Sequence, residues 1–373
     1  MNNGEDAAAP DPVLDTEHED VILKRLSRRI RGARSNPSPK RLHSAFLVSD
    51  AEYFWDRHLR DLINDALGLG VARARGLAPF GDVIGEAFAT TRYLLAGYIQ
   101  LAGKMNDLAL SKWMPQSHRT APKVRALAQL HARSLILIEE VFVLTTMGYP
   151  SGALALARAL HEVRVIAKFL HRFEAKLSER YLESHIVDMW KSVDDLRPSG
   201  PARRSSQWLA VERELESRFN AVIATHGESM LIENGWALPR FNRTSAQTRL
   251  PRRIPFSRLE NEVKQPSDRA RYRYASRHVH ATRLGNISAL RSGDPGVALL
   301  GPRPYDLVRA ALQAMWDVQD VTESLMRSCG RFTDDQDVYY WLEALDQLSF
   351  VIRGSLNQGQ ESLDDIFATD HDQ

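Results

Sequence analysis

The segment Ala153–Phe169, ALALARALHEVRVIAKF, predicts an α-helix rich in alanine and leucine. Both residue types are strong helix formers. Arg158, His161 and Glu162 interrupt this apolar composition, and residues three or four apart lie on one face of a helix. The three polar side chains therefore form a stripe, in which Arg158 can pair with Glu162.

A second polar stripe lies about 110 residues later, in Arg271–Arg283, RYRYASRHVHATR. Tyr272, Ser276 and His280 recur at every fourth position, so in a helix they share a face. Two such stripes can meet in the interior of a helical bundle and form a site. Their positions predict where the protein acts, whereas their spacing does not name a reaction.

The rest of the chain predicts further helices and no sheet, because almost nothing alternates with period two. We therefore expect an all-α fold, a multi-helix bundle. Gly148 and Pro150 are typical of a point where one helix ends and the next begins. The expected helices cover roughly 50–67, 80–113, 121–147, 151–173, 175–196, 205–225, 304–328 and 335–353, with a short helix at Ser257–Glu260 and another that Ser267 caps and that carries the second stripe.

Three parts of the chain are predicted. A flexible charged N-terminal tail covers 1–45, a helical bundle domain with the candidate site covers 46–330, and a C-terminal helix with an acidic tail covers 331–373. Glycine, proline and arginine break the helical pattern over 228–256, which predicts a long, basic, irregular insertion. The acidic end after Gln358 is expected to be partly disordered.

Charge is strongly segregated along the chain, although the formal net charge is only +2. Met1–Asp20 carries seven acidic residues and no Lys or Arg, whereas Val21–Ser49 carries eight Lys or Arg and no acidic residue. Arg240–Arg291 has thirteen basic against three acidic residues, and from Asp317 onward thirteen acidic residues oppose three basic ones. Such segregation can steer a polyanion to one face, although charged runs are also typical of solvated surfaces.

Several functional classes lack their signatures. The single cysteine, Cys329, excludes an internal disulfide framework and a thiolate zinc site, and a reducing cytoplasm is the simplest location. No signal peptide and no membrane-spanning segment are predicted. No phosphate-cradling Gly-x-x-x-x-Gly-Lys-Ser/Thr loop and no Gly-x-Ser-x-Gly elbow occur. We therefore expect no metal, no cofactor and no membrane partner.

Each stripe has a structural and a functional interpretation. Arg158 and Glu162 form either a structural ion pair between helices or an arginine that its glutamate positions to bind an anion. A partly buried charge pair is costly to desolvate, which adds weight to the second interpretation but leaves the structural ion pair as the first. His280 can act as a general acid or base near neutral pH, with Tyr272 and Ser276 orienting it or binding substrate. The alternative for this stripe is a hydrogen-bonded core network.

Four elements occur in a fixed order over roughly residues 125–290: the helix SGALALARALHE at Ser151–Glu162, then Tyr181, then Gly235-Trp236, then Tyr272-x3-Ser276-x3-His280-Ala281. Together they resemble the bacterial domain-of-unknown-function family numbered 5677. The resemblance implies a fold and a site, but it brings no activity.

Arginine followed by histidine after four to six residues occurs in four pairs: Arg180/His185, Arg164/His171, Arg273/His278 and Arg273/His280. The pattern is similar to the signature of the HEPN superfamily of helical ribonucleases, although chance alone supplies about as many matches. Residues seven apart nearly eclipse in a helix, whereas residues five apart point about 140° from each other. The favoured pair is therefore Arg273 with His280.

The similarity to HEPN proteins implies metal-free RNA cleavage by a homodimer. The 2′-hydroxyl of RNA would attack the adjacent phosphate, His280 would move a proton, and Arg273 or Arg158 would stabilise the developing negative charge. We thus expect a metal-independent endoribonuclease that acts as a growth-arrest or anti-phage effector. The expected catalytic residues are His280, Arg273, Arg158 and Glu162, and the expected substrate-binding residues are Tyr272, Ser276, Arg277, His161, Tyr181, Arg252 and Arg253.

The alternative function is a non-catalytic helical module. Such a module would bind nucleic acid, a phosphorylated small ligand or an acidic protein partner. RNA or another polyanion is the expected partner in either case, in the cytoplasm.

Overall fold

The computed structural model describes part of the chain. The described residues are 78, 80–113, 121–196, 205–241, 251–263, 268–279, 302–329 and 336–368. The chain divides into two units, Met1–Glu86 and Ala87–Gln373. In the first unit the described residues 80–86 are helical. The tail predicted for 1–45 and the helix predicted for 50–67 lie outside the described residues.

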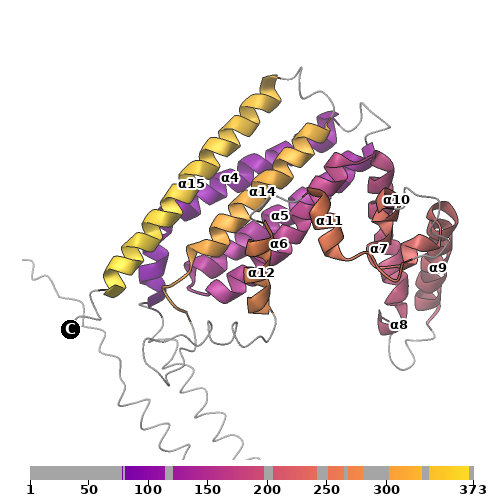
Figure 1. The fold of residues 1–373 in the computed structure, drawn as a ribbon, viewed down its shortest axis with the longest axis horizontal. Coiled ribbons are helices and arrows are strands. Elements are labelled where there is room, and N and C mark those ends of the chain that lie inside the picture. The colour runs from indigo at the N-terminus through magenta and orange to yellow at the C-terminus, as the bar shows by residue number, and fades with distance from the viewer. Residues whose placement is uncertain are drawn as a thin grey trace, which may run out of the picture. The chain divides into compact units, whose positions relative to one another are not determined.

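The second unit is an all-α bundle, which confirms the predicted fold class (Figure 1). Its helices are α4 (Ala89–Leu108), α5 (Ala121–Thr146), α6 (Pro150–Arg172), α7 (Ala175–Lys191), α8 (Val193–Leu196), α9 (Ser206–His226), α10 (Leu238–Phe241), α11 (Phe256–Val263), α12 (Asp268–Val279), α14 (Val308–Ser328) and α15 (Gln336–Ala368). Short helical turns add Ala109–Trp113, Glu228–Leu231 and Gly235–Ala237. The described residues contain no strand, and an isolated bridge joins Glu233 to Arg253.

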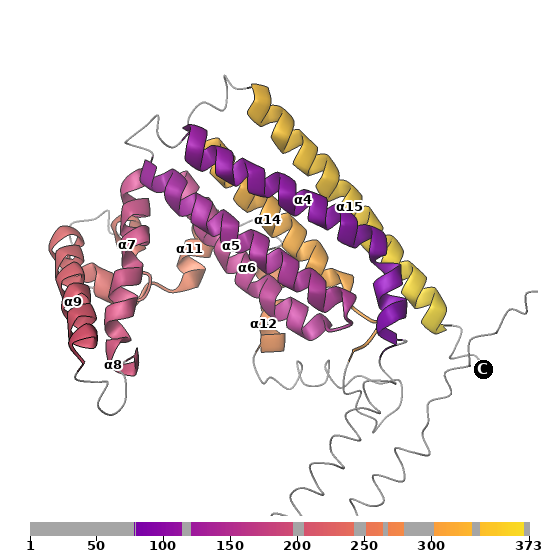
Figure 2. The same ribbon diagram turned by 180° about the vertical axis from the view of Figure 1, so that it is seen from behind.

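Helices α5, α6 and α14 pack against one another and form the core of this unit. Helix α15 lies beside α4 and also contacts α14, as both views show (Figures 1 and 2). Helix α7 packs on α5 and pairs with α9, while α11 and α12 lie against α6. No described helix is long and apolar enough to cross a membrane.

Helix α6 is the central element, and no residue from Ser151 to His171 is exposed. Its fully buried side chains include Leu160 and Phe169, and burial of each stabilises the fold by roughly 2 kcal/mol. The start of α6 was predicted correctly. Gly148 ends α5 with φ at 79° and its N–H bonded to the Thr145 carbonyl at 3.1 Å, and Pro150 opens α6.

Two predictions about the rest of the chain were wrong or incomplete. Up to Ala368 the expected partial disorder after Gln358 is wrong, because α15 continues to that residue; 369–373 lie outside the described residues. Leu356 and Leu363, seven residues apart, are buried, so one face of α15 packs on the bundle despite its acidic composition. The insertion predicted for 228–256 is only partly irregular, since it holds two helical turns and α10; residues 242–250 lie outside the described part.

The stability of the protein is expected to depend on pH through His131. This residue is buried on α5, with Nδ1 3.3 Å from Asn106 Oδ1 and Nε2 3.0 Å from Thr322 Oγ1. Burial lowers the pKa of His131 from 6.5 to about 4. The unfolded chain therefore takes up a proton below pH 6.5 that the folded protein refuses until about pH 4, so stability is lost as the pH falls through this window.

Between pH 7 and pH 5 this one group should cost roughly 2 kcal/mol of unfolding free energy. Urea unfolding at the two pH values measures the loss. A His131→Gln variant, which has no such group, should lose less than the parent over the same interval. An equal loss in the parent and the variant would assign the pH dependence to other groups.

Candidate polar site between α6 and α12

The two polar stripes meet, because α12 packs against α6. Arg158 Nη2 donates a hydrogen bond of 2.9 Å to the Tyr272 hydroxyl, which donates in turn to Glu162 Oε1 at 3.2 Å. Arg158 and Glu162 also form the predicted ion pair, with Nη2 3.1 Å from Oε1. The three residues thus make a closed triangle of polar contacts that joins the two helices.

The ring of Tyr272 is surrounded by aromatic and cationic groups. The Arg158 guanidinium lies 5.2 Å from the ring centroid, and the rings of His161 and Phe256 lie at 5.3 and 5.9 Å. Burial raises the pKa of Tyr272, a hydrogen bond from Arg158 opposes this, and the charge of Glu162 adds to the rise. The hydroxyl therefore stays protonated at neutral pH, as a hydrogen-bonding group and not a nucleophile.

His161 contacts Glu260, a residue far along the chain that local spacing does not predict. Its Nε2 lies 3.2 Å from Glu260 Oε1, and both side chains are buried. The contact ties α11 to α6 beside Tyr272. We assign His161 a positioning role here, because its ring packs on Tyr272 while its nitrogen binds Glu260.

Helix α12 has one side that packs on the bundle and one basic side that faces solvent. On the packed side, Ala275 is fully buried, and the Arg309 guanidinium lies over the Tyr274 ring, 3.7 Å from the ring centroid. Ser276 is half-buried, whereas Arg273 and Arg277 are exposed. The structure thus separates the predicted residues of α12 into an anchoring side and a solvent side.

The remaining predicted residues lie elsewhere or outside the described part. Arg252 and Arg253 are exposed, just before α11. Tyr181 is on α7, where its ring meets the Trp236 ring edge-on at 5.1 Å. It therefore belongs to another part of the molecule than the Arg158–Tyr272 contact. His280 lies outside the described residues.

Arg180, the arginine of one predicted arginine–histidine pair, is committed to a structural role. It is buried, and it donates hydrogen bonds to the carbonyls of His226, Gly235 and Trp236 at 2.8, 3.0 and 2.9 Å, and to Ser229 Oγ at 2.7 Å. A guanidinium that is held by four acceptors inside the protein does not reach a substrate.

Arg164, the arginine of another pair, is also buried. Its Nε lies 3.6 Å from Asp317 Oδ1 and is bonded to Asp320, which also accepts from Lys168 Nζ at 3.0 Å. His171 completes this pair in the sequence, but its Nδ1 lies 2.7 Å from Ser328 Oγ. These contacts join α6 to α14. Of the arginines in the predicted pairs, Arg273 alone is exposed among the described residues.

Nothing in the described part of the chain resembles a metal centre, because no three His, Cys, Asp or Glu side chains there lie close enough together to hold an ion. The chemistry available at the α6–α12 contact is that of hydrogen bonds, one tyrosine hydroxyl and arginine charge.

The described part of the chain is thus an all-α bundle with a tyrosine-centred polar contact between α6 and α12. Residues 124–294 match the model of the family described as "Family of unknown function (DUF5677)". The match confirms the resemblance predicted over roughly residues 125–290, and it includes both polar stripes. No curated protein and no solved structure matches the chain. The similarity to HEPN ribonucleases stays a prediction.

Proposed function

We propose that the chain binds RNA through the exposed face of α12. One observation supports this proposal above the others: Arg269, Arg273 and Arg277 are all exposed and follow one another at intervals of four residues. Side chains at this spacing lie along one face of a helix, about 6 Å apart along its axis. A row of arginines is suited to the phosphates of a nucleic acid strand, which dominate the affinity of such complexes.

The opposite side of α12 keeps this row in place. Tyr272 is hydrogen-bonded to Arg158 and Glu162, and Ala275 is buried against the bundle. Arginines on a helix that is anchored in this way lose less conformational entropy on binding than arginines on a flexible segment. The exposed Arg252 and Arg253 add positive charge in the segment before α11.

Cleavage of the bound RNA is a second candidate, because Arg273 is exposed while Arg164 and Arg180 have buried structural partners. The 2′-oxygen would attack the adjacent phosphorus as it loses its proton, and the 5′-oxygen would leave with a proton. The products would be a 2′,3′-cyclic phosphate and a 5′-hydroxyl. Arg273 would stabilise the charge on the phosphate, and His280, seven residues further along the chain, would transfer a proton.

The finer parts of this proposal have other grounds. The homodimer and the role as a growth-arrest or anti-phage effector rest on the similarity to HEPN ribonucleases, and the cytoplasmic location rests on the single cysteine, Cys329. The alternative without turnover is a helical module that binds nucleic acid, a phosphorylated small ligand or an acidic protein partner.

An Arg273→Gln/Arg277→Gln variant is expected to bind single-stranded RNA at least tenfold more weakly than the parent. Each lost phosphate contact should also reduce the slope of log affinity against log salt by about 0.7. Fluorescence anisotropy with a labelled oligoribonucleotide at several salt concentrations measures both quantities. Tyr272→Phe removes the hydroxyl anchor but no charge, and should reduce affinity less.

The matched control is Arg133→Gln/Arg218→Gln, which removes two charges from exposed positions of α5 and α9. It should bind nearly as the parent does, and equal weakening in both double variants would refute α12 as the contact. Electrophoresis of the same mixtures, with chelator present, reports cleavage. RNA that the parent cuts and the His280→Ala variant leaves intact supports catalysis. Intact RNA in both samples contradicts catalysis and favours the alternative of a module that binds RNA without turnover.

A further inference from the structure

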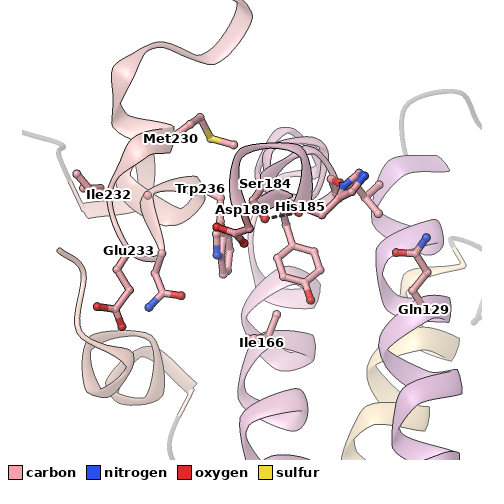
Figure 3. A pocket seen from close by; sticks show the side chains of 13 residues that line it. Gln129, Ile166, Ser184, His185, Asp188, Met230, Ile232, Glu233 and Trp236 are labelled. Carbon is pink, nitrogen blue, oxygen red and sulfur yellow. Dashed lines mark hydrogen bonds between the residues drawn. The ribbon is translucent and has the colours of Figure 1, made fainter. Parts of the chain in front are cut away.

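A cavity of about 590 Å³ lies between α7 and the segment 230–236, with one residue each from α5 and α6 at its border (Figure 3). Its size is within the range of small-molecule sites, roughly 300–1,000 Å³. Arg158, Glu162 and Tyr272 do not line it. The cavity is therefore separate from the proposed RNA contact. Its lining includes Tyr181 and Gly235-Trp236, which carry part of the family resemblance.

The wall formed by 230–236 is preorganised. The Arg180 guanidinium fixes it by donating hydrogen bonds to the carbonyls of Gly235 and Trp236. Asn234 has a left-handed backbone, with φ at 55°, and its side-chain nitrogen donates to the Ile254 carbonyl at 3.0 Å. A side chain at Gly235 would overlap the Ser229 carbonyl oxygen. A wall that is fixed before binding costs little entropy when a ligand arrives.

The charge of the lining is negative. Asp188 on α7 and Glu233 on the opposite segment are exposed, and neither carboxylate has a hydrogen bond or ion pair with the described residues (Figure 3). None of the described lining residues is Lys or Arg. The lining also holds His185, whose Nδ1 lies 2.6 Å from the Leu182 carbonyl oxygen. Two exposed carboxylates attract cations and repel phosphates and other anions.

The deeper part of the lining is aromatic. Tyr181 and Trp236 lie edge to face, and burial raises the pKa of Tyr181, so its hydroxyl stays neutral. Ile166 adds an apolar surface beside them. Aromatic rings stabilise ammonium groups, and the methylene groups of an alkyl chain pack on such a surface.

We propose that this cavity binds an aliphatic diamine or polyamine. The ammonium groups pair with the carboxylates of Asp188 and Glu233, and the alkyl chain lies on Tyr181 and Trp236. Two anionic groups, an aromatic floor and a described lining that holds His185 but no Lys or Arg together distinguish this class of ligand from nucleotides and from neutral metabolites.

Titration calorimetry of the full chain with spermidine, in buffer of physiological ionic strength, tests the proposal. The parent should bind in a one-to-one complex, and Asp188→Asn/Glu233→Gln should bind at least tenfold more weakly. The matched control is Glu179→Gln/Glu216→Gln, which removes two carboxylates from exposed positions of α7 and α9 outside the cavity. Its affinity should stay within about twofold of the parent's.

A second variant separates a ligand effect from a charge effect. Gln129→Trp, at an exposed position on the border of the cavity, fills part of the space without removing a charge and should also weaken spermidine. Thermal unfolding without spermidine checks that every variant folds. No binding by the parent, or equal affinities for the cavity and control variants, would overturn the proposal. RNA binding should be the same in the parent and in Asp188→Asn/Glu233→Gln.

Discussion

Replacement of Gly235 by alanine is expected to lower the free energy of unfolding by roughly 3 kcal/mol or more, the range of severe backbone and packing defects. The new Cβ would overlap the carbonyl oxygen of Ser229 and lie 2.9 Å from Cγ1 of Ile232. A backbone oxygen does not move aside as the end of a flexible side chain does. Arg180 also binds the Gly235 carbonyl, so the turn has no free direction in which to shift.

Urea unfolding, followed by tryptophan fluorescence, measures this loss. Gly354→Ala is the matched control, because Gly354 lies within α15 and, apart from its chain neighbours and the adjoining backbone of the helix, no atom lies within 4 Å of the position of its added Cβ. Alanine there should raise stability by roughly 0.5–1 kcal/mol, since glycine weakens a helix interior. If Gly235→Ala has the same urea midpoint of unfolding as the parent, the close approach of position 235 to the Ser229 carbonyl does not constrain the fold.

Replacement of Arg164 by methionine is expected to cost about 3–5 kcal/mol, as for other buried ion pairs that lose one partner. The side chains of Arg164 and Asp317 are 4% and 3% exposed. Methionine fills much of the arginine's volume but leaves Asp317 buried without this cation. Asp320 is affected less, because Lys168 continues to bind it at 3.0 Å.

A double replacement tests the origin of this loss. Arg164→Met/Asp317→Leu removes both charges of the pair and should recover part of the stability, because the stranded carboxylate is gone. Arg327→Met breaks the exposed ion pair with Glu323 and should change stability by less than about 1 kcal/mol. Similar losses for Arg164→Met and Arg327→Met would show that burial of the first pair does not matter.

The predictions from the sequence succeeded where the information is local. The spacing of Arg158 and Glu162 predicted their pairing, and Gly148 with Pro150 predicted the reversal between α5 and α6. The four-residue spacing of Tyr272 and Ser276 predicted that both lie on one helix, which is α12. Helical periodicity and backbone stereochemistry act over a few residues, so they are visible in the order of the residues.

The partners from distant segments were not predicted. His161 meets Glu260 and Arg164 meets Asp317, about 100 and 150 residues further along the chain. Such pairs depend on which helices pack together and in what register, and neither is set by local spacing. The acidic composition near the C-terminus likewise hid the buried positions Leu356 and Leu363 of α15.

The candidate site divides in the same way. The sequence placed the two stripes correctly as possible neighbours, and Tyr272 indeed contacts Arg158. It did not separate Tyr181 from them, because membership of one family pattern does not imply membership of one site. The elements Tyr181 and Gly235-Trp236 lie together in the structure, at the cavity beside α7. His280 stays a prediction, outside the described residues.

The central position of α6 has a consequence for the time during which the chain is made. Helix α14, which covers one face of α6, ends at Ser328, more than 150 residues after Arg172. A ribosome that adds 5–20 residues per second needs roughly 8–30 seconds for that length. Throughout this interval the newborn α6 and α5 lack their third core helix. The charged side chains of Arg164 and Lys168 then keep the uncovered face of α6 hydrated until α14, which carries their partners Asp317 and Asp320, has been synthesised.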